Sequence, residues 1–598
     1  MLSSPKFLFG SLVAAVVILI LGRFVTMPVG LVAAEVFATI IGLFVFGSFK
    51  YQIHKNALTY GMALIIIATF CGLATSEWHV EIAARGWWHW ARYQLLSFHG
   101  LDDLVHADTM LFILGLTFFV SVIAQTRLLE GITFFLLRRN RGAILPTVIA
   151  VTAVVAFASG ILDGVSMIGL TIRTLVIILM LAAAPTASIR YAVMVCTAVT
   201  TICGIWLAYG EPPNLIMKAN LIDPLSGASY LTNGFFLRYC APAAVASYLV
   251  IAWQLRRKLG GETVDLDTMD VVDANAETVR FLQASRHGDV LTSVELVEDG
   301  AADLGDKTAR VLERLHQGAS LGIALVHENV ATATRQKLLG HFVSEDLAEA
   351  LDRHYVLDAS GDHAGALEAE KVVDDTLASM ARHRQRAQLI GALALAPFIG
   401  MLVAHGINHK IPLFLASFAG FIVALLGIIS IPKMRSLALR EARHEYAEYY
   451  FLFPLFFSIT LLTKAGFFDE MQTLIQHGVD ALGHAHVAFA QFLGCTFLSA
   501  ILDNNVVADF ASRALHHLDI AVMHLFALAQ IAGYALGGCW THIGCAQSVV
   551  AYAFIQRDVD ARYTPVQWIK EMTPVIIEIL VLLTAIIYIE SAILAWLH

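Results

Sequence analysis

Long uninterrupted stretches of apolar residues limit the possible folds of this chain more than any other feature. Many of them reach about 18 residues or more, the length that an α-helix needs to cross a hydrocarbon core about 30 Å thick. Hydrophobic residues make up 58% of the 598 residues and charged residues 15%, against about 25% charged in soluble proteins. The stretches do not alternate polar and apolar residues as barrel strands do. We therefore expect an all-α polytopic membrane protein.

The apolar stretches predict about eleven transmembrane helices and two re-entrant hairpins. Two stretches, 143–184 and 485–515, have polar centres and are the expected hairpins. No clear cleavage site follows the first stretch, so residues 1–27 are expected to hold a retained transmembrane helix. Two of the spans, 188–220 and 519–556, are too long for a simple helix and contain helix breakers. The expected spans are 7–26, 28–48, 56–76, 109–126, 188–220, 234–255, 388–404, 411–431, 448–468, 519–556 and 573–597.

Basic residues between the spans indicate the orientation of the chain, because cytoplasmic loops are enriched in Lys and Arg. With the N-terminus inside and both hairpins returning to the side they enter from, every basic cluster lies in the cytoplasm. The first hairpin then enters from the cytoplasm and the second from outside. Charge alone does not exclude two full spans at a hairpin, but each arm is marginal in length for spanning. We expect the bacterial inner membrane as the location.

An acidic segment separates the two membrane regions. Residues 256–387 carry 15 basic and 24 acidic residues, so this segment holds the whole net charge of −9. It has helical stretches such as DKTARVLERLHQGA, and no glycine-rich nucleotide loop or metal-spaced His and Cys set. We expect a small cytoplasmic helical insert. The chain then divides into a first helix (1–27), a first repeat (28–255), the insert (256–387) and a second repeat (388–598).

Two nineteen-residue stretches of the chain repeat each other. FASGILDGVSMIGLTIRTL (157–175) and FLSAILDNNVVADFASRAL (497–515) align without a gap at an offset of 340, with seven identities. Because the predicted hairpins enter from opposite faces, the two halves are inverted in the membrane. Inverted repeats with interrupted helices are typical of secondary transporters, whose binding site lies at the repeat interface near the midplane. The identical pairs are Phe157/Phe497, Ser159/Ser499, Ile161/Ile501, Leu162/Leu502, Asp163/Asp503, Arg173/Arg513 and Leu175/Leu515.

A break interrupts the predicted span that follows each hairpin. The first reads AYGEPPNLIM (208–217) and the second reads LGGCWTHIGCAQS (536–548). Consecutive prolines cannot continue a helix, because their N–H donors are missing and their rings clash with the preceding turn. Such backbone is tolerated at membrane depth only where it is buried or lines a cavity. The carbonyls and N–H dipoles of the broken ends can bind ions.

Together these features resemble the ion transporter superfamily, which includes divalent anion:sodium symporters, arsenite efflux permeases and one class of sodium/proton antiporters. GEPPNLIM (210–217) is similar to the Gly-x-Pro-Pro-Asn stretch of the symporters. LSAILDNNV (498–506) is similar to the Leu-Asp-Asn hairpin tip of the arsenite and antiporter branches. The resemblance covers the membrane regions, about 28–255 and 388–597, and not the insert.

This resemblance implies a scaffold domain, a mobile transport domain and a homodimer that works by an elevator motion. It also implies a transporter and not an enzyme. The expected partners are membrane lipid, a small inorganic cation and protons, with no nucleic acid. Sodium and protons are then transported ions, and no cofactor is expected.

The hairpin tips depart from the symporter pattern. Those proteins carry Ser-Asn-Thr at both tips, where it ligates sodium and the substrate carboxylate. Here the tips read LDG (162–164) and LDN (502–504), so carboxylates replace neutral hydroxyls. This change disfavours an anionic substrate and favours a cation. Gly164 also departs from the Asn that the antiporter branch carries, which predicts unequal tips.

Three acidic residues at the tips and the first break are candidate ion ligands. Asp163 and Asp503 occupy repeat-related tips, where each could also cap a helix by accepting hydrogen bonds from free N–H groups. Glu211 lies in the first break, where pairing with Lys218 or an arginine is the alternative. A carboxylate inside the bilayer is costly and is retained mainly for function.

A fourth acidic candidate, Asp509, breaks the symmetry of the repeat. It lies two turns into the second hairpin arm, where the first repeat has Gly169. Pairing with Arg513 one turn later is the alternative to ion binding. For the repeated arginines, Arg173 and Arg513, we expect salt bridges within the transport domain.

Polar neighbours complete the predicted site. Asn214, Asn504, Asn505 and Thr541 supply oxygen atoms, which hard cations prefer. His542 aligns with Asn214 across the breaks and either carries a proton or only donates a hydrogen bond. The sodium candidates are Asp163, Asn214, Asp503 and Asn504.

Competition between a proton and sodium for one buried carboxylate predicts exchange, because burial favours the protonated form unless a cation lies beside it. We therefore predict a sodium/proton antiporter with elevator-type alternating access. The alternative is a sodium-coupled transporter of a dicarboxylate or an arsenite-like anion. A membrane-anchored sensor is disfavoured, since the insert carries no recognisable catalytic or nucleotide motif.

Overall fold

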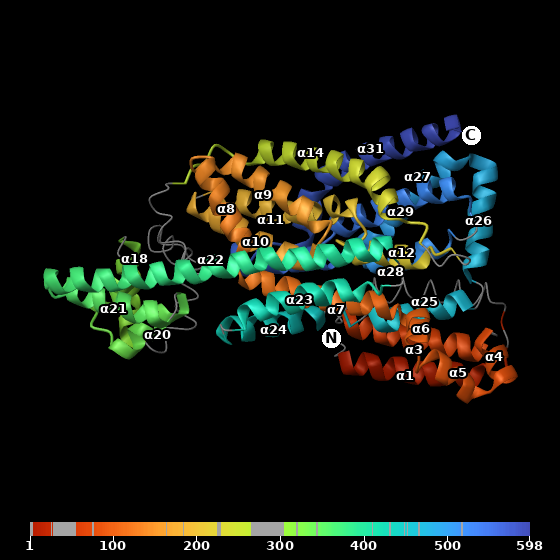
Figure 1. Cartoon of the computed structure of the whole chain (residues 1–598), viewed down its shortest axis with the longest axis horizontal. Coiled ribbons are helices and arrows are strands. Elements are labelled where there is room, and N and C mark those ends of the chain that lie inside the picture. The colour runs from red at the N-terminus through yellow and green to blue at the C-terminus, as the bar shows by residue number, and fades with distance from the viewer. Residues whose placement is uncertain are drawn as a thin grey trace.

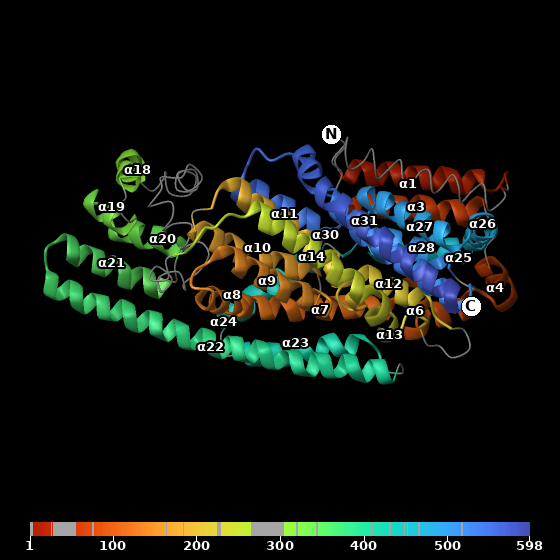
Figure 2. The ribbon, with the colours of Figure 1, turned by 90° about the horizontal axis from the view of Figure 1, so that it is seen from above.

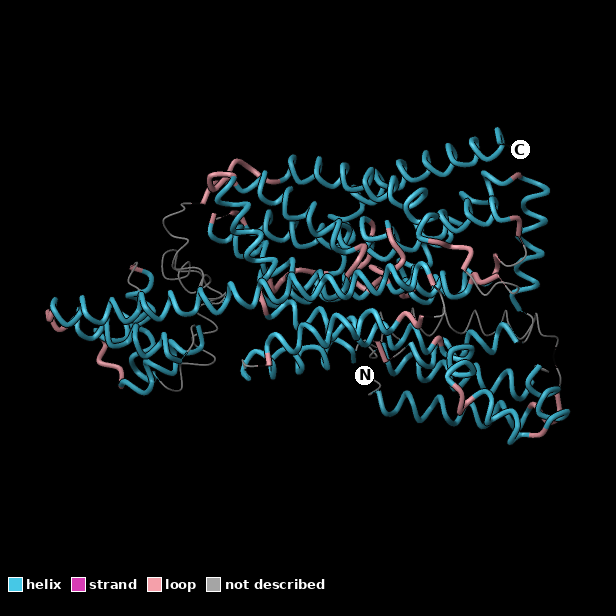
Figure 3. Tube along the Cα trace, in the orientation of Figure 1, coloured by secondary structure: helices cyan, strands magenta, loops and turns pink. Residues whose placement is uncertain are grey.

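The structure is a computed structural model in which the described residues form helices and no β-strand (Figure 3). Two isolated bridges, Ala143 with Thr263 and Ile222 with Ser229, join loops. The described residues are 4–25, 27, 55–73, 77–162, 164–182, 184–223, 229–264, 304–317, 321–342, 345–408, 411–429, 432–447, 449–450, 452–464, 467–515 and 518–597.

Seven of the described helices are long and apolar enough to cross a membrane, which confirms the all-α polytopic class. They are Ala107–Gln125, Thr186–Trp206, Asn233–Lys258, Gln385–His405, His484–Ile501, Ile520–Trp540 and Pro565–Trp596. Shorter apolar helices cover Pro5–Leu21, Ala57–Thr69, Ile144–Ser159, Gly164–Met180 and Phe414–Ile428. The expected span 28–48 lies outside the described residues.

The membrane helices form two groups, which lie in the upper and lower parts of Figure 1. We call the lower one the scaffold group, in which α7 packs on α23 and α24, and α25 packs on α3 and α6. It comprises α1 (Ser4–Leu21), α3 (Lys55–Leu73), α4 (Glu77–Arg85), α5 (Trp87–Gln94), α6 (Phe98–Val105), α7 (Ala107–Gln125), α23 (Phe414–Ile428), α24 (Pro432–Ala447) and α25 (Leu452–Lys464).

We call the upper one the hairpin group, because it contains both repeat-related segments. Its first half comprises α9 (Ile144–Ser159), α10 (Gly164–Leu181), α11 (Thr186–Thr201), η2 (Cys203–Trp206), α12 (Pro212–Asn220) and α14 (Ala241–Lys258). Its second half comprises α27 (His484–Ile501), α28 (Asn504–Arg513), α29 (Ile520–Trp540), α30 (Ala546–Phe554) and α31 (Pro565–Leu597). The connecting elements are α8 (Leu128–Arg139), α13 (Asn233–Phe235), η3 (Phe236–Cys240), α26 (Phe467–Leu482) and η6 (Ile555–Val559).

Small residues bring the helices of the hairpin group close together, as is common where lipid supplies no hydrophobic driving force between helices. A side chain at Gly533 of α29 would meet the backbone carbonyl of Phe492 and the Cβ of Cys495 in α27. A side chain at Gly537 would collide with the carbonyl of Thr496. The first break has the same requirement, since a side chain at Gly210 would collide with the carbonyl of Ser159.

The described part of the insert folds around a small apolar core of its own. This core includes Val311, Leu321, Ala324 and Leu325, all fully buried. Its helices are η5 (Gly305–Lys307), α18 (Thr308–His316), α19 (Leu321–His327), α20 (Thr332–Phe342) and α21 (Glu345–Ala359). Figure 2 shows the insert at one end of the molecule, beyond the membrane helices.

One helix joins the insert to the scaffold group. Helix α22 runs from His363 to Ile407 without interruption and packs on α21 at one end and on α23 at the other. The expected boundary at 387/388 therefore falls inside a helix. Helix α22 therefore joins the insert to the scaffold group, while the first residues of the insert also contact the start of the first hairpin, where the N–H of Ile144 donates to the carbonyl of Glu262 at 3.1 Å.

Candidate functional site

The two hairpins contact the two breaks through matching backbone hydrogen bonds. The N–H of Gly164, at the start of α10, donates to the carbonyl of Gly210 at 3.0 Å. The N–H of Asn504, at the start of α28, donates to the carbonyl of Gly544 at 3.2 Å. Each carbonyl directly precedes the N-cap of the next half-helix, which is Glu211 for α12 and Cys545 for α30. The inverted repeat is thus visible as one repeated contact.

This contact sets which residues of the two breaks are equivalent. Pairing Gly210 with Gly544 pairs Asn214 with Ser548. The sequence alignment instead paired Asn214 with His542, and the structure does not place these two residues in equivalent positions. The helix before each break ends at a tryptophan four residues ahead of the glycine, Trp206 in the first break and Trp540 in the second, so this pairing needs no gap within the breaks.

A carboxylate–amide pair joins the halves. Glu211 is 2% exposed, and the Nε2 of Gln547 on α30 donates to both of its carboxylate oxygens, at 2.9 and 3.1 Å. Gly164 adjoins this pair, because a Cβ there would collide with Oε1 of Glu211 and come within 2.7 Å of Nε2 of Gln547. Gly164 corresponds to Asn504 in the second repeat. In the first repeat, the carboxylate of Glu211 occupies the space where a side chain at position 164 would lie.

The second tip is organised by Asp503. This residue is 2% exposed and is the N-cap of α28. The Oδ1 of Asp503 accepts two hydrogen bonds from Asn505, one from the backbone N–H at 3.0 Å and one from the side-chain Nδ2 at 2.6 Å. The helix-capping alternative is therefore realised, and it leaves the carboxylate in the same buried region as the second break. The repeat-related Asp163 lies outside the described residues.

The predicted amides lie beside these carboxylates and are buried. Asn214, on α12, donates through Nδ2 to the carbonyl of Leu207 at 3.1 Å and accepts from the hydroxyl of Tyr534 through Oδ1. Asn504 and Asn505 are 3% and 4% exposed. The Oδ1 of Asn505 has no hydrogen-bond partner among the described residues, so it keeps an oxygen for a ligand.

Thr541 and His542 lie on the other side of the second break. The hydroxyl of Thr541 donates to the carbonyl of Ala500 at 2.5 Å, which ties the break to α27. The ring of His542 packs against Tyr552, with ring centroids 4.8 Å apart. The contact of Thr541 favours a positioning role for that residue, whereas the buried Nδ1 of His542 has no hydrogen-bond partner among the described residues.

Asp509 forms a separate cluster along α28. It is fully buried, and its Oδ1 accepts from Nε of Arg513 at 2.9 Å and from Nδ2 of Asn220 at 2.7 Å. Pairing with Arg513, the alternative to ion binding, is therefore present in the structure. The Oδ2 of Asp509 has no hydrogen-bond partner among the described residues.

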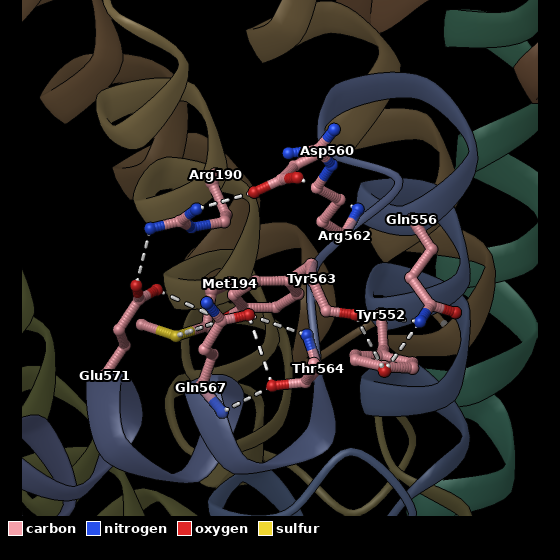
Figure 4. Close-up of polar contacts among 10 residues, drawn as sticks. All are labelled: Arg190, Met194, Tyr552, Gln556, Asp560, Arg562, Tyr563, Thr564, Gln567 and Glu571. Atoms are coloured by element: carbon pink, nitrogen blue, oxygen red, sulfur yellow. Dashed lines mark hydrogen bonds and ion pairs between the residues drawn. The ribbon is translucent and has the colours of Figure 1, made fainter.

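A third polar cluster ties α11 to α31 and resembles a structural clamp (Figure 4). Arg190 donates to Asp560 at 2.8 Å and to Glu571 at 2.7 Å, and the hydroxyl of Tyr563 donates to Glu571 at 3.1 Å. Burial, together with the charge of Glu571, raises the pKa of Tyr563. Both terminal nitrogens of the guanidinium are thus engaged by carboxylates, while its buried Nε has no hydrogen-bond partner among the described residues.

Sequence reasoning missed Gln547, Tyr534 and Asn220, each of which contacts a predicted residue from another helix. Their one sequence signal is a lone polar side chain in an apolar helix, which is too common to select them. Within the described residues, no group of three His, Cys, Asp or Glu could hold a metal ion.

Comparison with protein-family models identifies a family that covers most of the chain. The model of a protein family described as CitMHS, citrate transporter, matches residues 7–533. No curated protein matches the chain.

Proposed function

This chain belongs to the citrate transporter family, a member of the ion transporter superfamily, and from that membership we propose that it carries a citrate-like polycarboxylate across the membrane together with cations. It is an integral membrane transporter and not an enzyme. The substrate and the coupling ion are the proposed parts. Of the two functions drawn from the sequence, the family favours the alternative, a sodium-coupled transporter of a dicarboxylate or an arsenite-like anion, over sodium/proton antiport, although citrate itself was not among the predicted substrates.

The convergence of four helix starts carries this proposal. Backbone hydrogen bonds join the start of α10 to the residue before the N-cap of α12, and the start of α28 to the residue before the N-cap of α30. The pair of Glu211 and Gln547 joins α12 to α30. Helix N-termini carry partial positive charge and free N–H groups, which suit carboxylate ligands.

The carboxylates at the same place require cations. Glu211 and Asp503 are both buried, and a buried charge is costly unless it is paired. A polycarboxylate would add negative charge, so sodium ions or protons beside these groups are needed for the loaded site to be stable. Asp503, Asn504, Asn505, Glu211 and Asn214 are the residues that we assign to this site.

Sodium/proton antiport without an organic substrate is the second candidate. The observation that favours it is the pair of buried carboxylates, Glu211 and Asp503, which could hold either ion in turn. The two candidates differ in one respect, since only the first requires citrate for ion movement.

An elevator motion fits the division into two groups of helices. We propose that the hairpin group moves against the scaffold group, in a homodimer in the bacterial inner membrane with the N-terminus and the insert in the cytoplasm. The site lies wholly within the hairpin group, so it could cross the membrane as a unit. The basic loops support the orientation.

Flux measurements on purified protein in liposomes test these proposals. We expect uptake of radiolabelled citrate that needs an imposed sodium or proton gradient and that Asp503→Asn abolishes. A pH dye inside the liposomes reports proton movement in the same sample. Cation-driven proton movement without citrate would favour antiport, and absence of both fluxes would contradict the proposal.

A further inference from the structure

The repeat-related arginines both reach from the hairpin group to the scaffold group. All three guanidinium nitrogens of Arg513 are engaged, with Nε on Asp509 at 2.9 Å in its own helix. Its Nη1 donates to the hydroxyl of Thr463 on α25 at 2.8 Å, and its Nη2 contacts Nε2 of His106 at 3.1 Å. The expectation of salt bridges within one domain is therefore incomplete for this residue.

Arg173 makes the equivalent contact in the first repeat. Its Nη2 lies 3.1 Å from Oε1 of Glu441 on α24, and the other oxygen of Glu441 accepts from Gln125 of α7. The expectation of a salt bridge within the transport domain is therefore wrong for Arg173, because its partner belongs to the scaffold group. The two groups are thus joined by one arginine from each half of the repeat.

The contact between Arg513 and His106 defines the protonation state of the histidine. A guanidinium has five N–H donors and no acceptor. The Nε2 of His106 must therefore accept, which requires a neutral imidazole with its proton on Nδ1. Protonation would place an N–H against an N–H and a cation against a cation, so it would break the contact.

The surroundings of His106 hold its ring in place. The residue lies between α6 and α7 with φ 49°, a left-handed conformation that is uncommon for residues with a side chain. Its ring packs edge-on against Phe456 of α25, with centroids 4.9 Å apart. The ring therefore cannot follow Arg513 if the hairpin group moves.

Among the described residues, the charged groups that act on this histidine are Asp509 and Arg513 on α28, with Asn220 on α12 as a polar neighbour. Burial lowers the pKa of His106 to about 4; Arg513 adds to the lowering, while Asp509 and Asn220 oppose it.

The acids on its own two helices are engaged elsewhere, and Asp103 lies 3.9 Å from Nε2 of His99 on the exposed side of α6. Oδ1 of Asp102 accepts from the backbone N–H of Asp108 at 2.8 Å, and Asp108 accepts from the backbone N–H groups of Leu413 and Phe414 at 3.0 Å.

We propose that His106 and Arg513 form a proton-sensitive latch that holds the second hairpin against the scaffold group and releases it when the histidine is protonated. The latch rests on the proposed function, because it needs the two groups to move apart. It adds a role for protons that is separate from their binding at the carboxylates.

Linkage gives the direction and the size of the effect. An exposed imidazole has a pKa of about 6.5, and the latched one about 4. The released state therefore binds protons more tightly, and latching is fully present above about pH 7 and weakens as the pH falls through 6.5. At pH 5.5 the ratio of latched to released protein should be about tenfold lower than at pH 8.

Distance measurements by electron spin resonance test the latch without relying on transport. Spin labels on Ala187→Cys and Arg443→Cys, exposed positions on α11 and α24, report the separation of the two groups in liposomes. The six cysteines whose side chains are described are buried and should not take a label. We expect a second distance that grows about tenfold in relative population from pH 8 to pH 5.5.

Three variants make the test specific. His106→Gln keeps an acceptor but does not titrate, so its distances should not change with pH. His486→Gln removes an exposed histidine of α27 and should behave as the unaltered protein. Arg513→Lys cannot reach all three partners and should populate the second distance even at pH 8, which tests the latch if His106→Gln fails to fold.

The outcomes separate the latch from the proposed function. A second distance with full pH dependence in His106→Gln would overturn the latch and leave the motion intact. A single distance at every pH, with citrate and sodium present, would overturn the elevator motion and the latch together. Citrate uptake in that same sample would retain the substrate assignment.

Discussion

The carboxylate of Glu211 accepts two hydrogen bonds from the amide of Gln547, a residue 336 positions away, at 2.9 and 3.1 Å. This contact joins the two inverted halves at the point where their broken helices restart. Neither residue can be replaced without changing the other half of the site. The predictions that follow from it concern the pair itself and the groups packed around it.

Replacing Gln547 by leucine should impair both folding and transport. The carboxylate of Glu211 would lose two hydrogen bonds in a buried place, which costs about 1–3 kcal/mol. We expect a lower unfolding temperature in detergent and loss of citrate uptake. Gln556→Leu, on an exposed glutamine of η6, the element that directly follows α30, is the control and should change neither. Normal uptake by Gln547→Leu would contradict a role for the pair in the site.

Adding one methyl group at Gly164 should disrupt the pair from the other side. The new Cβ would collide with Glu211 and crowd Gln547, and displacing groups at a site by about 1 Å can lower a rate about 100-fold. We expect Gly164→Ala to reduce initial uptake about 10- to 100-fold. Gly169→Ala is the matched control in the same helix, because a Cβ there meets nothing within 4 Å. Equal rates for the two variants would show that the space beside Glu211 is not needed.

Neutralising Asp503 should separate its capping role from its charge. Asparagine caps helices about as well as aspartate, so Asp503→Asn should change stability by less than about 1 kcal/mol. Transport driven by a cation gradient should be lost. Asp519→Asn is the control, since Asp519 caps α29 by the same contact to the residue two positions on, at 2.9 Å, in an exposed place. Retained coupling in Asp503→Asn would remove the tip carboxylate from the site.

Acidification should loosen the insert before the membrane helices. Hydrogen bonds from Arg314 and Arg310 lower the pKa of Glu328 below its ordinary value of 4.5. The contribution of this group to stability is therefore present above about pH 4.5 and is lost as the pH falls through the lowered value. Hydrogen exchange of α18 to α20 in the full chain should accelerate between pH 5 and pH 3 beyond its intrinsic pH dependence. Glu328→Gln should remove this excess and Glu349→Gln should not, and the opposite result would contradict the assignment.

Much of the fold could be predicted, because it depends on local properties of the chain. Apolar length predicts helices at membrane depth, where every backbone group must be satisfied within its own helix. Pro212 and Pro213 predict a helix restart, and the structure has them in the first turn of α12. The offset of 340 between the repeats predicts two related tips, and both tips contact a break in the same way.

The partners of the predicted residues could not be found in this way. Asn214 and Tyr534 are 320 positions apart, and Asn220 and Asp509 are 289 apart, so no local pattern connects them. The pairing of Asp509 with Arg513 is local, since the two are one turn apart on α28, but Asn220 of α12, which contacts the same carboxylate oxygen, could not be predicted. The continuity of helix α22 could not be predicted either. A change from polar to apolar residues indicated a domain boundary at 387/388, although the backbone continues as a helix there.

The sequence by itself determined that this chain is a helical membrane protein with an inverted repeat, two broken helices and buried acids between its halves. These properties follow from hydropathy, helix breakers and identity at a constant offset, all of which act over short stretches of chain. Only the tertiary structure decided which groups share a site. Glu211 meets Gln547, and Arg513 meets His106, because inverted packing brings together helix ends that are hundreds of residues apart, and a carboxylate or an arginine inside a membrane takes whichever partner that packing supplies.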